Sequence, residues 1–245
     1  MLRTRRSFNS CNFAIPSVRY SAQSMEKPPT VCVFAHPDDE AFGPAGTIAH
    51  LAKTRDVYII CATNGDSDPQ FTKHKTDVLG QIRPQELIAS SKILGVKDVI
   101  FLNFKDGSLN NNSYHKLADA LKKTLIKLAP DTLLTYASNG ISGHLDHVAV
   151  SLVTSYVFYR MPGVHKIMYL LELEEKMKRT RDEYFVYMPP GIKKSEADLV
   201  IDTTPYWEKR VKSMYAHKSQ KSDADMIYNV IKDFPKEEYF KILEK

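Results

Sequence analysis

The sequence predicts an α/β protein with a doubly wound, mostly parallel β-sheet. Beyond Pro28 and Pro29, short apolar runs of strand character alternate with longer runs of helical periodicity. This alternation is typical of right-handed βαβ units, whose strands lie parallel in one sheet. Strands are expected at residues 31–35, 57–62, 98–102, 132–136, 165–171 and 197–202. Helices are expected at residues 46–53, 84–94, 114–128, 146–159, 206–217 and 223–233.

Local signals support these elements in chain order. The first strand, VCVFA, is continuously apolar, as expected where both faces of a sheet are covered, and VYIICA in the second strand has the same character. The helix at 84–94 has a proline at its start and Gly95 after its end. Leucines recur at helical spacing within 114–128, and Pro130 ends that helix. The last third of the chain is less regular.

The chain is organised as one domain behind an N-terminal leader. Its 245 residues, 43% of them hydrophobic, suit a single globular unit. Residues 1–24 are rich in arginine and serine and contain no acidic residue, which is typical of a transit peptide. Translation from an upstream start codon, with the domain beginning near Met25, is an equally good explanation. We expect a leader or disordered extension over residues 1–29 and the domain over residues 30–245.

Composition also restricts location and partners. Three cysteines, an odd number at spacings that match no zinc pattern, indicate a reducing compartment: the cytoplasm, or an organelle if the leader is a targeting signal. No apolar run approaches the roughly 18–20 residues that span a bilayer, so no integral membrane segment is expected. The net charge of +5 falls to about +1 without the four arginines of the leader, which argues against a nucleic-acid partner.

Polar loops, three of them containing glycine, follow four of the expected strands. In open parallel sheets, ligands bind at the carboxyl ends of the strands, so these loops are expected to form one functional site. The four segments are residues 36–40 (HPDDE), 63–66 (TNGD), 103–107 (NFKDG) and 138–147 (SNGISGHLDH).

The HPDDE loop combines a histidine with three consecutive acids. Like charges this close repel one another unless a cation neutralises them. His36 and Asp39 can reach the same metal ion if the chain turns at Pro37. A helix N-terminus, which favours acidic side chains, is the alternative for residues 38–40, but it leaves the histidine unexplained. We therefore expect His36 and Asp39 to bind a divalent metal.

The GHLDH loop supplies a third candidate ligand, His147. Two imidazoles and one carboxylate, with positions left open for water, form the ligand set of a catalytic zinc site. The same set also suits iron(II). Metal-assisted hydrolysis then gives the remaining groups roles: Asp38 as general base, His144 as oxyanion stabiliser or proton donor to the leaving nitrogen, and Asp146 as the group that orients His144.

Arg83 is a further candidate site residue. At the expected start of a helix after the second strand, it could contact hydroxyl or phosphate groups of a substrate. An exposed arginine at the helix start is the alternative interpretation.

Three motifs together resemble the PIG-L/LmbE-type N-acetylglucosaminyl deacetylases. AHPDDE follows the first strand, GHLDH the fourth, and HKSQ lies near the C-terminus, so the resemblance covers roughly residues 30–221. It implies a Rossmann-like three-layer fold and one zinc ion bound by His36, Asp39 and His147. It also implies Asp38 as the base, His144 as acid or oxyanion stabiliser, and a position near the site for His217.

The function expected from this resemblance is zinc-dependent removal of an N-acetyl group from an N-acetylglucosamine-type sugar conjugate, a small-molecule partner. Residues 30–245 would then be a deacetylase domain. The glycolipid branch of the family usually has Asn where Asp146 stands, and its members normally carry a membrane anchor. No such anchor is expected in this sequence. A metal amidohydrolase acting on a non-sugar N-acyl group and a non-catalytic sugar- or metal-binding protein are the alternatives. The sequence does not predict the oligomeric state.

Overall fold

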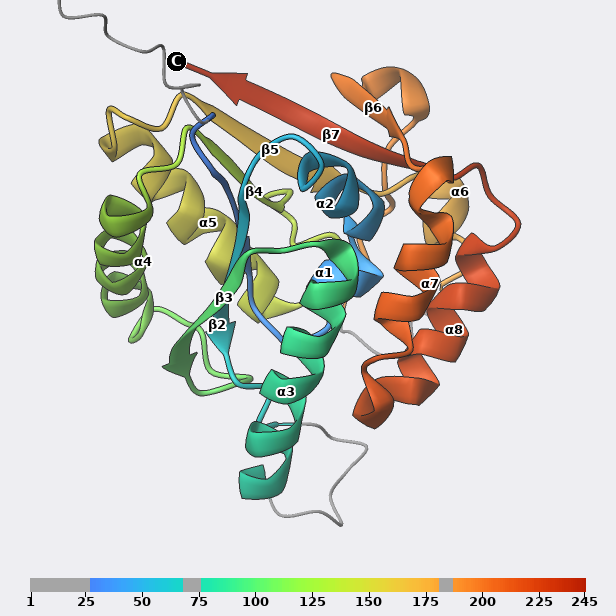
Figure 1. Ribbon diagram of the computed structural model, residues 1–245, viewed down its shortest axis with the longest axis horizontal. Coiled ribbons are helices and arrows are strands. Elements are labelled where there is room, and N and C mark those ends of the chain that lie inside the picture. Colours follow the sequence, from blue (N-terminus) through green and yellow to red (C-terminus); the bar gives the residue numbers. More distant parts are fainter. Residues whose placement is uncertain (1–26, 68–75, 181–186) are drawn as a thin grey trace, which may run out of the picture.

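The computed structural model describes residues 27–67, 76–180 and 187–245 (Figure 1). Most of the expected leader, with Cys11, lies outside the described residues. The strands are β1 (Thr30–Phe34), β2 (Val57–Thr63), β3 (Asp98–Phe104), β4 (Thr132–Tyr136), β5 (Lys166–Leu171), β6 (Leu199–Asp202) and β7 (Glu237–Glu244). The helices are α1 (Asp39–Phe42), α2 (Ala45–Leu51), α3 (Thr76–Leu94), α4 (Tyr114–Leu128), α5 (Leu145–Arg160), α6 (Glu174–Met177), α7 (Trp207–Met214) and α8 (Lys221–Ile231). Among these helices, none is both long and apolar enough to cross a membrane.

The strands form one seven-stranded sheet in the order β3-β2-β1-β4-β5-β7-β6. The first five are parallel to one another, and β7 runs antiparallel to both β5 and β6. The chain moves outward from β1 to β3 on one side and then returns to place β4 on the other side of β1. This reversal creates the crevice at the carboxyl ends of β1 and β4 where α/β proteins bind ligands.

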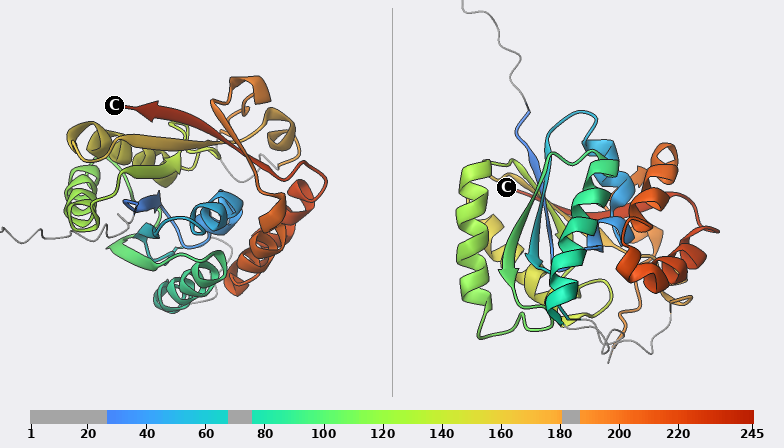
Figure 2. Two further views of the ribbon diagram at one scale, coloured as in Figure 1. Left: turned by 45° about the horizontal axis from the view of Figure 1, so that its top comes forward. Right: turned by 60° about the horizontal axis from the view of Figure 1, so that its bottom comes forward.

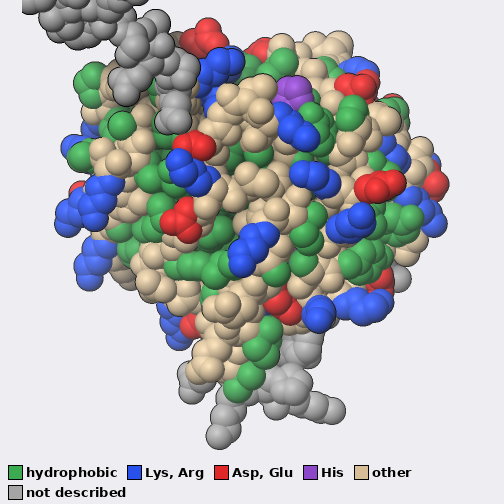
Figure 3. All heavy atoms as spheres, viewed as in Figure 1, with side chains coloured by type: hydrophobic (Ala, Val, Ile, Leu, Met, Phe, Trp, Pro, Cys, Tyr) green, Lys and Arg blue, Asp and Glu red, His purple; other side chains and the backbone are tan. Residues whose placement is uncertain are grey.

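Helices cover both faces of the sheet, which confirms the expected three-layer α/β fold (Figures 1 and 2). Helices α4 and α5 pack against each other and against β1, β3 and β4 on one face. Helices α1, α2 and α3 lie on the other face, where all three contact α7. On the side shown in Figure 3, basic side chains are scattered among acidic and apolar ones and form no stripe.

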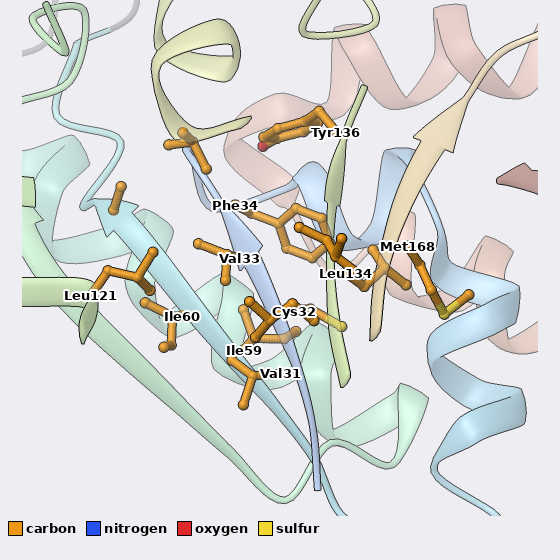
Figure 4. Packing of buried hydrophobic residues seen from close by; sticks show 14 of the residues in the cluster. Val31, Cys32, Val33, Phe34, Ile59, Ile60, Leu121, Leu134, Tyr136 and Met168 are labelled. Carbon is orange, nitrogen blue, oxygen red and sulfur yellow. The ribbon is translucent and has the colours of Figure 1, made fainter. Parts of the chain in front are cut away.

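The core lies along β1. Its side chains Val31, Cys32, Val33 and Phe34 are almost completely buried, and they alternate between the two faces of the sheet (Figure 4). Both faces are covered, so every residue of this strand can be apolar, as the sequence predicted. At the carboxyl end of the strand, the ring of Phe34 meets that of Tyr136 edge to face, with centroids 5.6 Å apart.

The expected start of the helix at residues 84–94 was wrong. Helix α3 begins at Thr76, eight residues before Pro84, which lies inside it. The buried side chains of Leu79, Arg83 and Leu87 recur every four residues, so one helix face packs against the protein across the proline. That packing offsets the main-chain hydrogen bond that Pro84 cannot donate. Arg83 is therefore a mid-helix residue rather than the residue that opens the helix.

Strand β7 was not predicted. It carries several charged residues, and one of them, Glu238, is buried. The Glu238 carboxylate accepts hydrogen bonds from the main-chain N–H groups of Gly46 and Thr47 at 2.9 and 2.7 Å and pairs with Arg210 at 3.1 Å. These partners are distant in sequence, so the local pattern gives no sign that this acid belongs to a central strand.

Candidate active site

The polar loops predicted from the sequence meet at the carboxyl edge of the sheet. A cavity of about 930 Å3 opens there. All seven predicted site residues line it: His36, Asp38, Asp39, Arg83, His144, Asp146 and His147. Asp106 and Tyr136 also line the cavity. The site is thus assembled from segments more than 100 residues apart, brought together where the strand order reverses.

The three predicted metal ligands converge. Nε2 of His147 lies 3.2 Å from Oδ1 of Asp39 and 3.1 Å from Nδ1 of His36. Nδ1 of His36 lies 3.7 Å from the other oxygen of Asp39. One ion placed between them could contact all three side chains, because each side chain has a ligand atom within 3.7 Å of one on each of the other two.

Hydrogen bonds at the far side of each imidazole identify the nitrogen that faces this point. Nδ1 of His147 lies 3.1 Å from the carbonyl oxygen of Gly140, which can only accept, so this nitrogen carries the proton. Nε2 of His36 lies 3.0 Å from Asp106 and 3.3 Å from Asp146, so it too is the protonated nitrogen. When both imidazoles are neutral, the two nitrogens that face each other therefore both present lone pairs, beside a carboxylate oxygen. Three electron-pair donors at this distance need a cation between them, and the residues fit a divalent metal.

The charge of the pocket agrees with this fit. Burial lowers the pKa of His36, but hydrogen bonds to Asp106 and Asp146 and the charge of Asp39 outweigh it and raise the pKa to about 10. For Asp39, burial raises the pKa, but His147, His36 and the Tyr136 hydroxyl hold it well below the usual range. The surroundings therefore keep the carboxylate ionised and favour a positive charge beside it, which a divalent metal would supply in place of a proton on Nδ1 of His36.

Tyr136, the last residue of β4, was not predicted as a site residue. Its hydroxyl donates to Oδ2 of Asp39 and accepts the main-chain N–H of Ala35 at 2.9 Å. Its ring stacks on that of His147, with centroids 4.3 Å apart and planes 2° from parallel. Tyr136 thus fixes two of the three ligands. Its sequence signal is only its place at a strand end.

The carboxylate of Asp146, expected to orient His144, contacts His36 instead. It accepts the main-chain N–H groups of Gly107 and Leu109 at 2.8 and 3.0 Å and lies against Nε2 of His36. Asp106, in the polar loop after β3, contacts the same nitrogen but was given no role from the sequence. Carboxylates in this position fix the orientation of a metal-binding histidine and increase its basicity.

Removing either carboxylate is expected to weaken metal binding. Asp106→Asn and Asp146→Asn should each lower zinc affinity by about 10- to 100-fold, because His36 loses an acceptor that orients it. Competition with a chromophoric chelator measures the change. Asp119→Asn, at an exposed position on α4, is the control and should bind zinc like the unmodified protein. Unchanged affinity in both site variants would contradict the assigned role.

Asp38 and Arg83 form a buried ion pair at the edge of the ligand set. Nη2 of Arg83 donates to Oδ2 of Asp38 at 2.8 Å and to the carbonyl of Pro37 at 3.1 Å. Burial raises the pKa of Asp38 to about 7, although Arg83 opposes this. Arg83 is not the exposed arginine of the alternative interpretation. Its contact with Asp38 adds a positioning role, and its contact with substrate stays a prediction.

The pair predicts a pH effect. Asp38 is the general base predicted from the sequence, and a base works only when ionised, so the prediction is that kcat/KM falls as pH drops through the pKa of Asp38. Arg83→Gln removes the cation that lowers this pKa, and the acidic limb should move to higher pH by about one unit or more. Arg55→Gln, which breaks the Arg55–Asp131 pair at the opposite end of the strands, is the matched control. An acidic limb that stays in place or moves down would refute the link between Arg83 and Asp38.

His144 precedes α5 and caps its N-terminus. Its Nδ1 accepts the main-chain N–H of Asp146 at 3.1 Å, so the ring proton lies on Nε2. Burial and then the nearby His36 and His147 lower the pKa of His144 to about 4. A neutral imidazole with Nε2–H is a hydrogen-bond donor at physiological pH. His144 also lies within metal-binding reach of His36 and His147, but one of its nitrogens is occupied by the helix cap.

His217 of the HKSQ motif lies beside the site, behind the HPDDE loop. Its Nε2 lies 2.7 Å from Oε1 of Glu40, and both side chains are completely buried. Glu40 thus serves as the partner of a distant histidine. Asp38 occupies the position before α1 without a side-chain capping bond, so capping does not explain the acidic run.

Comparison with known proteins agrees with this geometry. Residues 31–158 match the family described as PIG-L: GlcNAc-PI de-N-acetylase. The chain is 28% identical over 196 residues to the probable N-acetyl-alpha-D-glucosaminyl L-malate deacetylase 2 of Bacillus subtilis, covering 77% of this chain and 81% of the relative. It is 29% identical over 228 residues to the 1D-myo-inositol 2-acetamido-2-deoxy-alpha-D-glucopyranoside deacetylase of Corynebacterium glutamicum. This match covers 80% of this chain and 76% of the relative.

Among solved structures, N,N'-diacetylchitobiose deacetylase from Pyrococcus horikoshii shares the fold. Its TM-score is 0.68 at 20% identity, with 89% of this chain and 84% of that chain covered. The family match spans just over half of the chain and includes both loops that carry the predicted ligands. The protein therefore belongs to the PIG-L family of de-N-acetylases, as its motifs predicted, and is a deacetylase.

Proposed function

We propose that this deacetylase is a metal-dependent hydrolase that removes the acetyl group from the nitrogen of an N-acetylglucosamine-type sugar conjugate. The observation that carries the proposal is the convergence of His36, Asp39 and His147 beside the buried carboxylate of Asp38. The two relatives described above are named for malate and inositol conjugates of this sugar. Their names supply the substrate class, and the geometry supports the chemistry.

Zinc is the proposed metal, held by His36, Asp39 and His147. Two imidazoles and one carboxylate are a common catalytic zinc set, although iron(II) accepts the same ligands. When bound, the metal would polarise the acetyl carbonyl and acidify a water molecule. Asp106, Asp146 and Tyr136 keep the ligands oriented.

The proposed roles of the other residues follow from their protonation states. Asp38, ionised and held by Arg83, takes a proton from the attacking water. His144 donates its Nε2–H to the acetyl oxygen as negative charge develops there. When the C–N bond breaks, the proton held by Asp38 passes to the amine nitrogen. The products are then acetate and a free sugar amine.

The domain boundaries stay a proposal. We assign residues 30–245 to one deacetylase domain, because strands from β1 to β7 belong to a single sheet. The C-terminal strand supports this extent, since Glu238 binds the start of α2 close to the site. Residues 1–29 are proposed as the leader.

Release of acetate tests the function. The substrates are a panel of N-acetylglucosamine conjugates with malate, myo-inositol and a second sugar, assayed with zinc and after chelation. Chelator-sensitive release from any member supports the proposal. Release only from non-sugar N-acyl compounds would replace the sugar conjugate with another N-acyl donor as the substrate. Absence of release from the sugar conjugates and from the non-sugar N-acyl compounds, with one metal bound per chain, would overturn the assignment in favour of a binding protein.

A further inference from the structure

A buried charge network lies directly behind the catalytic loop. Oε1 of Glu40 contacts Nε2 of His217 at 2.7 Å and accepts the hydroxyl proton of Ser90. None of these three side chains exposes any surface to solvent. Burial lowers the pKa of His217, but the charge of Glu40 and the hydrogen bond to it outweigh this and raise the pKa. The pair therefore has the character of a buried ion pair between the HPDDE loop and the C-terminal part of the chain.

The second oxygen of Glu40 reaches the main chain of the proposed base. Oε2 accepts the N–H of Asp38 at 3.2 Å. Asp38 has a φ of 137° and a ψ of −23°, a conformation that residues other than glycine rarely adopt. Such a conformation persists only when its surroundings impose it. Glu40 is one of the groups that do so here, and His217 in turn fixes Glu40.

The turn that carries His217 is anchored independently of Glu40. In the 3-10 turn Lys218–Gln220, the main-chain N–H and the hydroxyl of Ser219 donate to Glu86 of α3 at 2.9 and 2.6 Å. This second connection would hold the turn in place without any histidine. It also provides a control, because its hydroxyl hydrogen bond can be removed without touching Glu40.

Stability alone is a poor explanation for His217. Burying an ion pair costs desolvation energy, and a well-packed apolar pair often stabilises a protein as much or more. In addition, Nδ1 of His217 is buried with no hydrogen-bond partner among the described residues. A polar group kept at such a place indicates a role that depends on its contact with Glu40.

We propose that His217 is a positioning residue, which acts through Glu40 to hold the main chain of Asp38 in the conformation that aims its carboxylate into the site. This inference rests on the proposed function of Asp38 as base. It assigns a role to a residue outside the segment that matches the family, 31–158. The HKSQ motif would thus tie the C-terminal helices α7 and α8 to the chemistry at the sheet edge.

Three variants of the full chain test the proposal. His217→Leu removes the donor to Glu40, and His217→Gln keeps a side-chain N–H in a similar place. Ser219→Ala removes the hydroxyl donor to Glu86, while the main-chain donor remains. For each, kcat and KM are measured on the best substrate of the wild-type protein, together with bound zinc. Hydrogen exchange of the Asp38 amide gives a readout that does not depend on activity.

The expected pattern separates positioning from folding. His217→Leu should lower kcat by about 10- to 100-fold, with KM within about twofold and one zinc per chain, because a misplaced base costs rate rather than binding. The Asp38 amide should exchange faster in this variant. His217→Gln should recover most of kcat and slow the exchange again, and Ser219→Ala should stay within about twofold of wild type.

Several results would overturn the inference. One is wild-type kcat and unchanged Asp38 exchange in His217→Leu. Another is an equal loss in Ser219→Ala and His217→Leu, which would mean that only the fold of the turn matters. If His217→Leu does not fold, failure of His217→Gln to restore kcat in a folded, zinc-loaded protein has the same meaning. Wild-type protein inactive on every substrate would refute the proposed function instead, while the exchange experiment would still test the contact.

Discussion

Asp38→Asn is expected to lower kcat by about two to four orders of magnitude while the protein still binds one zinc per chain. Asparagine has nearly the same shape and can still accept a hydrogen bond from Arg83, but it cannot take a proton from water. Asp38 is not among the three converging ligands, so metal content should not change. Steady-state kinetics of acetate release and metal analysis of the same sample give both quantities.

The matched control for this variant is Asp131→Asn. Asp131 also pairs with an arginine, Arg55, at 2.9 Å, but it lies before β4, at the opposite end of the strand from the site. It should retain wild-type kcat. If Asp38→Asn retained full activity, another group would have to be the base. Loss of zinc in that variant would instead make Asp38 a ligand.

His147→Ala is expected to abolish tight zinc binding and activity together. It removes one of three protein ligands, so the loss of affinity should exceed the roughly 10- to 100-fold cost of losing an outer carboxylate. A ligand that binds the native state but not the unfolded chain stabilises the protein, and the gain in free energy rises with the logarithm of the ligand concentration. Added zinc should therefore raise the melting temperature of the wild-type protein but not that of His147→Ala.

The control for the ligand assignment is His115→Ala, since His115 is an exposed histidine on α4. It should bind zinc and be stabilised by it like the wild type. A His147→Ala protein that keeps one tightly bound zinc would refute the ligand set. The remaining candidate would then be the group formed by His36, Asp106 and Asp146.

The sequence predicted best where local pattern and burial coincide. Helix α4 was predicted to the residue, because its leucines face the core at helical spacing and Pro130 ends it. Strand β4 was predicted equally well as a short buried run. Prediction failed where a distant partner decides the structure. The buried charge in β7 depends on Arg210, and α3 continues through Pro84 because of packing that the local sequence does not reveal.

The same division holds for the site. His36, Asp39 and His147 lie in two recognisable motifs, HPDDE and GHLDH, so the sequence alone predicts that they belong to one site, and the structure brings them together. Asp106 and Tyr136 are single residues at strand ends without a surrounding motif. Their roles depend on how β3 and β4 lie relative to β1, and only the fold supplies that order.

The main-chain conformation of Asp38 limits how far the folding stability of this protein can be raised. A non-glycine residue with such a φ costs about 1–3 kcal/mol of folding free energy. Glycine would remove that cost together with the carboxylate. Selection for thermal robustness would therefore oppose selection for the proposed base at this position. A consensus or design procedure that rewards a relaxed backbone would remove the carboxylate.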